Sequence, residues 1–240
     1  IVDLEDAVAP DAKTAAREAL MHWLSRATSQ VLVRVNASDT DWFADDLALC
    51  GHSAVGGVLL TKAERRADLA HASALAAGRR LYPLIETAAG FEAMRSLASA
   101  PGVERLMFGS IDFQVDLGIA GDDDALLAFR SQIVLASRLA GLRAPVDGVT
   151  AAIDDAERLR LDAERARRLG FGGKLCIHPK QVAVVERAFA PSEAERDWAR
   201  RVLDSAERAK GAAVAVDGKM VDKPVILRAR AILEDAARDA

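Results

Sequence analysis

The chain has 240 residues, 28% of them charged, and a formal net charge of −4. This length fits one large domain, and the slightly acidic balance excludes the basic field that attracts nucleic acid. No apolar run approaches the ~18 residues that a membrane span requires. The two cysteines, Cys50 and Cys176, lack CxxC spacing, which argues against a zinc site or a disulfide framework. We expect a cytoplasmic protein in which both thiols are buried.

Short apolar runs alternate with longer amphipathic stretches, which is typical of repeated βα units on a parallel sheet. Seven strands are expected, at residues 1–4, 31–35, 57–60, 81–85, 105–108, 145–149 and 173–177. Helices are expected between them, at residues 10–24, 64–77, 90–98, 124–140 and 154–169. The strand spacing of ~25–40 residues is that of a (β/α)₈ TIM barrel. Because a barrel must close, an eighth strand is expected before Ile1.

The pattern changes after residue 190. We expect a helix over 191–210, a hairpin over 211–222 with an Asp217-Gly218 turn, and a final helix from Pro224. The prediction is therefore a barrel over 1–190 and a C-terminal helical extension and lid over 191–240. Such a tail is too small to bury a core of its own, so it should dock on its own barrel or on a neighbouring subunit.

Glu86 and Asp112 are carboxylates that each follow an expected strand. The carboxyl ends of parallel strands meet at one face of a barrel, and Mg²⁺ is typically held there by one or two carboxylates. This placement suggests a divalent metal site. Strand-end acids also cap helices, however, and Thr87 or Ser110 could cap the two helices that follow.

Arg34 is a second candidate, because alternation places it on the same strand face as Leu32 and Asn36. There it either grips a substrate carboxylate in bidentate fashion or pairs with an acid of the protein. The acids of Asp3-Leu4-Glu5-Asp6, which closes the first strand, either bind waters at the metal or favour the positive end of the dipole of the following helix.

Several motifs together resemble one known family. They are DLEDAV at 3–8, VRVN at 33–36, IETA at 85–88, FGSIDF at 108–113, DLG at 116–118, GKLCIHPKQ at 173–181 and GKMVD at 218–222. In this order they resemble the signature blocks of citrate lyase beta subunit-like proteins, which include malyl-CoA and citramalyl-CoA lyases of the pyruvate/phosphoenolpyruvate-dependent aldolase superfamily. The resemblance covers essentially the whole chain. One departure is Thr61 before Lys62, where the family commonly has proline.

The resemblance implies a TIM barrel that assembles as a trimer or hexamer. It implies that Glu86 and Asp112 ligate Mg²⁺, that Glu5 and Asp6 orient water at the metal, and that Arg34 holds the carboxylate of a 2-oxo or 2-hydroxy acid. Gly109, Ser110 and Ile111 would contribute to substrate binding. Asp222 would reach the active site of an adjacent subunit and move a proton or activate water, although its place before Pro224 also fits a helix N-cap.

The implied function is a Mg²⁺-dependent carbon–carbon lyase of a short β-hydroxyacyl-CoA, such as malyl-CoA or citramalyl-CoA. Its partners would be an acyl-CoA thioester and a 2-oxo acid. The alternatives are a malyl-CoA thioesterase, an aldolase for a sugar-derived 2-oxo acid, and a citryl thioester lyase subunit that depends on a partner or an acyl carrier protein.

Overall fold

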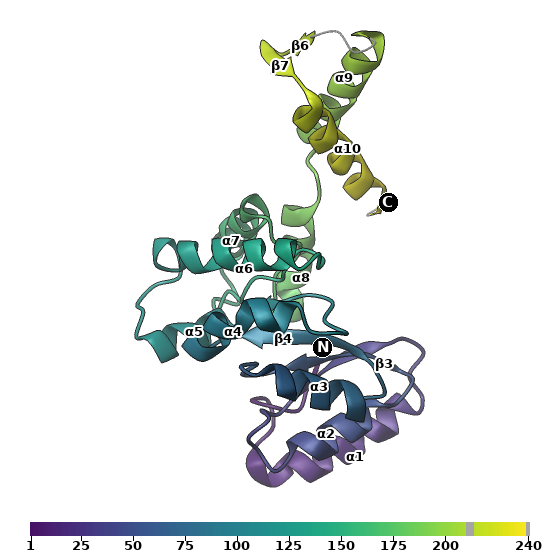
Figure 1. Ribbon diagram of the computed structural model, residues 1–240, viewed down its shortest axis with the longest axis vertical. Coiled ribbons are helices and arrows are strands. Elements are labelled where there is room, and N and C mark those ends of the chain that lie inside the picture. The colour runs from purple at the N-terminus through teal and green to yellow at the C-terminus, as the bar shows by residue number, and fades with distance from the viewer. Residues whose placement is uncertain (210–213, 239–240) are drawn as a thin grey trace. The chain divides into compact units, whose positions relative to one another are not determined.

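The computed structural model describes residues 1–209 and 214–238 and divides the chain into two compact units, Ile1–Pro179 and Lys180–Ala240 (Figure 1). The expected boundary after residue 190 lies just after the end of helix α8, Pro179–Phe189. The division between the two compact units falls at the start of this helix.

The first unit is built on a parallel sheet with strands in sequence order. The strands are β1 (Val2–Asp3), β2 (Val31–Val35), β3 (Val55–Leu60), β4 (Arg80–Ile85) and β5 (Met107–Phe108). The register sets Asp3 beside Arg34 and Leu84 beside Met107. This arrangement confirms an α/β protein with a parallel sheet.

The prediction of the last two strands of this unit was wrong. Within the described chain, residues 145–149 and 173–177 continue the sheet only through isolated parallel bridges, Met107 to Val146 and Asp147 to Lys174. Pro145 has no N–H to donate, and Gly148 and Gly173 weaken an extended conformation, which accounts for the short pairing.

Helices alternate with the strands, as expected. They are η1 (Pro10–Ala12), α1 (Lys13–Leu24), α2 (Phe43–Cys50), α3 (Arg66–Leu75), α4 (Ala88–Ala98), α5 (Ser110–Leu117), η2 (Asp124–Leu126), α6 (Leu127–Leu139) and α7 (Ala156–Leu169). The sequence did not predict α2 or α5, which have eight residues each. Thr87 caps α4 by accepting a hydrogen bond from Gly90 N–H, whereas Ser110 makes no such cap for α5, whose N-cap is Gly109.

The interior of the sheet is an apolar cluster of Leu59, Tyr82, Leu84, Met107 and Val146, against which Leu32 and Leu175 pack. Side chains alternate along a strand, so every second residue shares a face. Arg34 comes two residues after Leu32, and Glu86 comes two residues after Leu84. Both therefore continue the interior face at the carboxyl end of the sheet.

The second unit contains α9 (Glu193–Ala209), the hairpin strands β6 (Val214–Val216) and β7 (Lys219–Val221), and α10 (Lys223–Arg238) (Figure 1). Asp217 and Gly218 have φ values of 51° and 74°, as the turn of a tight hairpin requires. The unit has a small core of its own, made by Ala199, Val202, Val216, Val221, Ala229 and Ile232. The expectation that this tail buries no core was therefore wrong. Residues 211–213, the expected start of the hairpin, lie outside the described residues.

The structure bears on two expectations from composition, which concern membrane-spanning helices and the burial of the cysteines. No helix within residues 1–209 and 214–238 is long and apolar enough to cross a membrane. Cys50 is buried as expected, but Cys176 is exposed, so the expectation of two buried thiols was wrong for Cys176.

Candidate active site

Glu86 is a buried carboxylate at the carboxyl end of β4, with only 3% of the residue exposed. The backbone N–H of Lys62 donates to its Oε1 at 2.6 Å, and Lys62 adopts a left-handed φ of 45°, which is uncommon for a residue other than glycine. Burial raises the pKa of Glu86 to about 8, and the nearby carboxylates of Asp112 and Glu5 add to this effect. A cation beside Glu86 would therefore favour its ionised form.

Helix α5 brings Asp112 to the same place, in its first turn. The helix is anchored by Phe113, whose ring centroid lies 5.3 Å from that of Phe108 and 4.9 Å from that of Phe129. At its start, Gly109 N–H donates to the Ile85 carbonyl at 2.9 Å. Asp112 itself is exposed, so the two carboxylates form a site with one buried and one accessible side.

Two glycines make room for this arrangement. A Cβ atom at Gly109 would lie 2.5 Å from Glu86 Cβ and 2.7 Å from Glu86 Oε2. A Cβ atom at Gly148 would overlap the Ser110 side chain, 2.7 Å from its Cβ. Only glycine at these positions leaves Glu86 and Ser110 where they are.

Arg34 forms a bidentate pair with Asp3, one of the acids at the end of the first strand, and the sequence did not predict this pairing. Arg34 Nε donates to Asp3 Oδ1 at 2.8 Å, and Nη2 donates to Oδ2. Burial acts to lower the pKa of Arg34, but the hydrogen bonds and charges of Asp3, with Glu5, hold it above its ordinary value. Burial acts to raise the pKa of the partner Asp3, but the guanidinium of Arg34 and the backbone N–H groups of Glu5 and Ala7 together hold it below its ordinary value.

Glu5 and Asp6 extend the same cluster. Arg34 Nη1 lies 3.1 Å from Glu5 Oε2 and 3.7 Å from Asp6 Oδ2. Burial raises the pKa of Glu5, and the like charge of Asp6 adds to the effect while Arg34 opposes it. The acid-pairing interpretation of Arg34 is therefore confirmed, and substrate binding by Arg34 stays a prediction.

Buried polar contacts fix the turn that carries these acids. Lys13 Nζ donates to the carbonyls of Leu4 at 2.7 Å and Glu5 at 2.8 Å, and Asn36 Nδ2 donates to the Leu4 carbonyl at 3.0 Å. Asn36 is in turn held by the fully buried Asp46, whose Oδ2 accepts from its side chain at 2.6 Å. These contacts hold the turn next to Arg34.

The donor set fits a divalent cation. Asp3, Glu5, Asp6, Glu86 and Asp112 carry five carboxylates, and Arg34 lies among the first three. Within the described part of the chain no three His, Cys, Asp or Glu side chains form a ready-made metal cage. Mg²⁺ needs none, because one or two carboxylates suffice when waters and substrate oxygens complete its octahedron.

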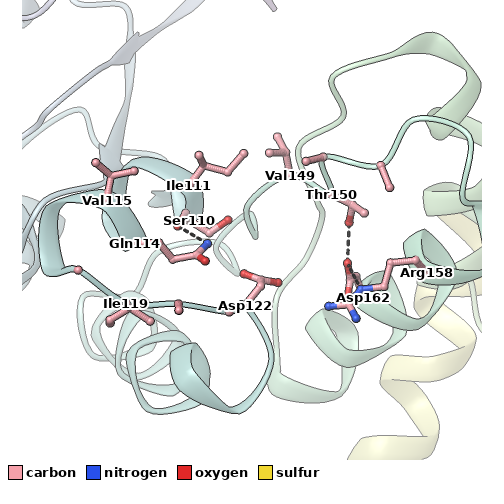
Figure 2. A pocket seen from close by; sticks show the side chains of 15 residues that line it. Ser110, Ile111, Gln114, Val115, Ile119, Asp122, Val149, Thr150, Arg158 and Asp162 are labelled. Carbon is pink, nitrogen blue, oxygen red and sulfur yellow. Dashed lines mark hydrogen bonds and ion pairs between the residues drawn. The ribbon is translucent and has the colours of Figure 1, made fainter.

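A cavity of about 790 Å³ lies beside the N-terminal half of α5 (Figure 2). It is lined by Ser110, Ile111, Gln114, Val115, Gly118, Ile119, Ala120, Gly121, Asp122, Val149, Thr150, Ala151, Ala152, Arg158 and Asp162. The Ser110 hydroxyl is buried and has no hydrogen-bond partner among the described residues. Two of the predicted substrate residues, Ser110 and Ile111, thus line a cavity, and Gly109 contacts Glu86.

Asp222 lies in the second unit, between β7 and α10. Its Oδ1 accepts a hydrogen bond from Val225 N–H at 3.1 Å, and its carbonyl accepts from Ile226 N–H at 3.0 Å. The helix-cap interpretation is therefore confirmed as a contact, and a catalytic role for Asp222 stays a prediction.

Sequence reasoning missed the pairing of Asp3 with Arg34 and the part played by Gly148. Both had a detectable signal, since Asp3 lies near the end of the strand expected next to that of Arg34, and Gly148 lies near the end of an expected strand, as Gly109 does.

Comparisons with known proteins identify relatives along the whole chain. Residues 1–179 match the family model HpcH/HpaI aldolase/citrate lyase. A citrate lyase subunit beta-like protein of Deinococcus radiodurans is 40% identical over 255 residues, covering 99% of this chain and 88% of that protein. A (3S)-malyl-CoA thioesterase of Cereibacter sphaeroides is 37% identical over 244 residues, covering 98% of this chain and 85% of that protein.

The fold has a close counterpart among solved structures. The protein CitE of Mycobacterium tuberculosis, in complex with magnesium, acetoacetate and coenzyme A, superposes with a TM-score of 0.86 at 36% identity, covering 98% of this chain and 88% of that one. The expected TIM-barrel-like fold, with C-terminal helices and a hairpin, is confirmed by this match.

Proposed function

Because the chain belongs to the HpcH/HpaI aldolase/citrate lyase family of carbon–carbon lyases, we propose that it cleaves a short β-hydroxyacyl-CoA in a Mg²⁺-dependent reaction. Malyl-CoA and citramalyl-CoA are the favoured substrates, and the products are acetyl-CoA and a 2-oxo acid. The observation that carries the proposal is the pair of Glu86 and Asp112, in which a buried carboxylate with a pKa of about 8 lies beside an exposed one.

Glu86 and Asp112 would hold the metal. Mg²⁺, when bound, supplies Lewis-acid stabilisation of the substrate oxygen whose charge changes as the carbon–carbon bond breaks. Glu5 and Asp6 would orient the waters around it, since both carboxylates already point toward the Arg34 end of the site.

Arg34 would bind the substrate carboxylate. Its Nε and Nη2 atoms are held by Asp3, which fixes the plane of the guanidinium, while Nη1 makes the longer contacts with Glu5 and Asp6. A substrate carboxylate would therefore approach the Nη1 side, where it would leave Asp3 in place and replace the contacts with Glu5 and Asp6. The first turn of α5, at Ser110 and Ile111, would add backbone N–H donors.

Asp222 would move a proton at the acetyl carbon, supplied across a trimer or hexamer by the lid of an adjacent subunit. Asp222→Asn tests this role, because asparagine caps helices as well as aspartate does but carries no charge. The variant should keep its thermal stability and lose turnover. Asp222→Ala should also lose about 1 kcal/mol of stability with the cap. Unchanged turnover in Asp222→Asn would leave the cap as its only role.

The experiment for the proposed function is a thioester panel. Malyl-CoA, citramalyl-CoA and citryl-CoA are incubated with the protein, with Mg²⁺ or with a chelator, and released 2-oxo acid and free thiol are measured separately. Metal-dependent release of 2-oxo acid supports the lyase. No release from any thioester would contradict it and favour a subunit that needs a partner or an acyl carrier protein.

A second candidate is a malyl-CoA thioesterase, favoured by the similarity to the Cereibacter sphaeroides enzyme over nearly the whole chain. The same metal site would then serve hydrolysis, with Asp222 activating water. In the panel this activity releases free thiol without a matching amount of 2-oxo acid.

A further inference from the structure

We propose that Asp116, in the last turn of α5, is a positioning residue that keeps the two proposed metal ligands, Glu86 and Asp112, together at the metal site. The inference rests on the proposed function, because it concerns the same site. Asp116 begins the DLG motif at 116–118, to which the proposed function assigns no part.

Two hydrogen bonds link α5 to the turn between β4 and α4, one at each end of the helix. Helices α4 and α5 lie side by side (Figure 1). At the start of α5, Gly109 N–H donates to the Ile85 carbonyl at 2.9 Å. In its last turn, Asp116 Oδ2 accepts from Ala88 N–H at 2.7 Å. The Asp116 side chain therefore makes the second of the two links.

Both proposed ligands lie between these two links. Glu86 is in the turn, between the two bonded residues there, and Asp112 is in α5, between the two bonded residues of the helix. Asp112 and Asp116 are four residues apart, so their side chains share one face of α5. The face that contacts the turn through Asp116 thus also directs Asp112 toward Glu86, and the charge of Asp112 indeed adds to the raised pKa of Glu86.

The bond to Ala88 suits a carboxylate. Ala88 is the first residue of α4, where the backbone N–H groups have no partner within the helix and the helix dipole is positive. The cap residue Thr87 accepts from Gly90 N–H at 3.0 Å, so it leaves the Ala88 N–H to Asp116. A carboxylate that accepts from such a donor makes a charge-assisted hydrogen bond.

An apolar contact keeps the two helices together without Asp116. Phe91 of α4 and Phe113 of α5 have ring centroids 5.7 Å apart. Apolar packing is non-directional, whereas a hydrogen bond fixes both a distance and an angle. Loss of Asp116 should therefore let α5 shift relative to Glu86 while the fold persists.

The test is calorimetric titration of the full chain with Mg²⁺, for the wild type, Asp116→Ala and Asp116→Asn. Asp116→Ala removes the acceptor and should raise the Kd for Mg²⁺ roughly tenfold, as loss of a supporting contact at a metal site does. Asparagine keeps an acceptor oxygen and serves at helix N-termini about as well as aspartate. Asp116→Asn should therefore bind Mg²⁺ within about threefold of the wild type.

Asp155→Ala is the matched control. Asp155 is an exposed carboxylate at the start of α7 that accepts from Arg158 N–H at 2.9 Å. Its substitution removes the same charge and the same kind of hydrogen bond as Asp116→Ala does. The free energy of unfolding, measured in urea, should fall by a similar amount in the two variants, but Asp155→Ala should keep the wild-type Kd for Mg²⁺.

Three results would overturn the inference. A wild-type Kd in Asp116→Ala would refute the positioning role and leave the proposed function standing. An equal loss of affinity in Asp116→Asn and Asp116→Ala would do the same, because the loss would then follow the charge and not the hydrogen bond. If the wild type itself binds no Mg²⁺, the inference and the metal site of the proposed function are both overturned.

Discussion

At the residue scale, Glu86 combines a proposed role in metal binding with a cost in stability at high pH. The carboxyl group is buried, it accepts the Lys62 N–H, and its pKa is raised to about 8. A metal-free protein therefore keeps Glu86 protonated at neutral pH, and ionisation follows only when a cation or a higher pH favours it.

The first prediction concerns pH and stability. The pKa of Glu86 is raised on folding, so its contribution to stability is fully present below the unfolded-state pKa of about 4.5 and is lost as the pH rises through about 8. We expect the free energy of unfolding of the metal-free protein, measured in urea with a chelator, to fall between pH 5 and pH 9 by an amount on the order of a few kcal/mol.

Glu86→Gln should abolish that part of the pH dependence, since glutamine does not titrate. With both proteins metal-free at pH 9, the variant should be more stable than the wild type. Identical pH dependence in the variant and the wild type would show that Glu86 is not the titrating group.

A second prediction at this scale concerns Gly109. A Cβ atom there would collide with Glu86, so Gly109→Ala should displace that carboxylate and weaken Mg²⁺ binding by roughly tenfold or more, as loss of a supporting contact typically does. Gly51→Ala is the control, because the nearest atom to its new Cβ would be the Ala48 carbonyl oxygen at 3.4 Å. Calorimetric titration of both variants with Mg²⁺ measures the effect, and equal affinity in the two would refute the packing argument.

At the element scale, buried charged side chains bind the segments 145–149 and 173–177, which pair with the sheet only through isolated bridges. Arg130, on α6, donates through Nε to Asp147 at 2.8 Å, and Lys174 Nζ donates to the Gly148 carbonyl at 2.6 Å. The side chains of Arg130, Asp147 and Lys174 are fully buried. Burial lowers the pKa of Lys174, while the charge of Asp147 opposes the shift.

The third prediction follows from this cluster. Arg130→Met should destabilise the protein by about 3–5 kcal/mol, because it leaves the buried Asp147 without its guanidinium partner. Arg138→Met, at an exposed position of the same helix, should change stability by less than about 0.5 kcal/mol. Chemical denaturation of both variants makes the comparison, and similar losses in the two would show that the buried pair contributes little.

Elements with a strong local pattern were predictable from the sequence. Strand β2 was predicted residue for residue, because it is rich in β-branched valine, and the prediction for β4 missed only its first residue, because the other five form a continuous apolar run. Helix α5 was missed because it is short and starts inside the motif that follows β5. The bridged segments 145–149 and 173–177 depend on tertiary charge contacts, which no local pattern reveals.

The candidate site was predictable in part for the same reason. Glu86 and Asp112 follow apolar strands, so their common edge could be inferred from the fold. The pairing of Arg34 with Asp3 depends on the register between β1 and β2, which residue alternation alone does not fix.

At the scale of the whole molecule, the proposed metal site and the proposed catalytic aspartate lie in different compact units. The proposed metal ligands, Arg34 and the cavity all lie in Ile1–Pro179, the unit that matches the family model. Asp222 lies in the second unit, which has its own small core. The metal chemistry can therefore be tested independently of the role of Asp222.

The most direct test of the central claim is calorimetric titration of the full chain with Mg²⁺, for the wild type, Glu86→Gln, Asp112→Asn and the control Asp45→Asn. Asp45 is a suitable control because its side chain is 71% exposed and pairs with Arg17, away from the proposed ligands. We predict one site per chain in the wild type and the control, and loss of that site in the other two variants with folding retained. Unchanged Mg²⁺ binding in both Glu86→Gln and Asp112→Asn would contradict the assignment of the metal site.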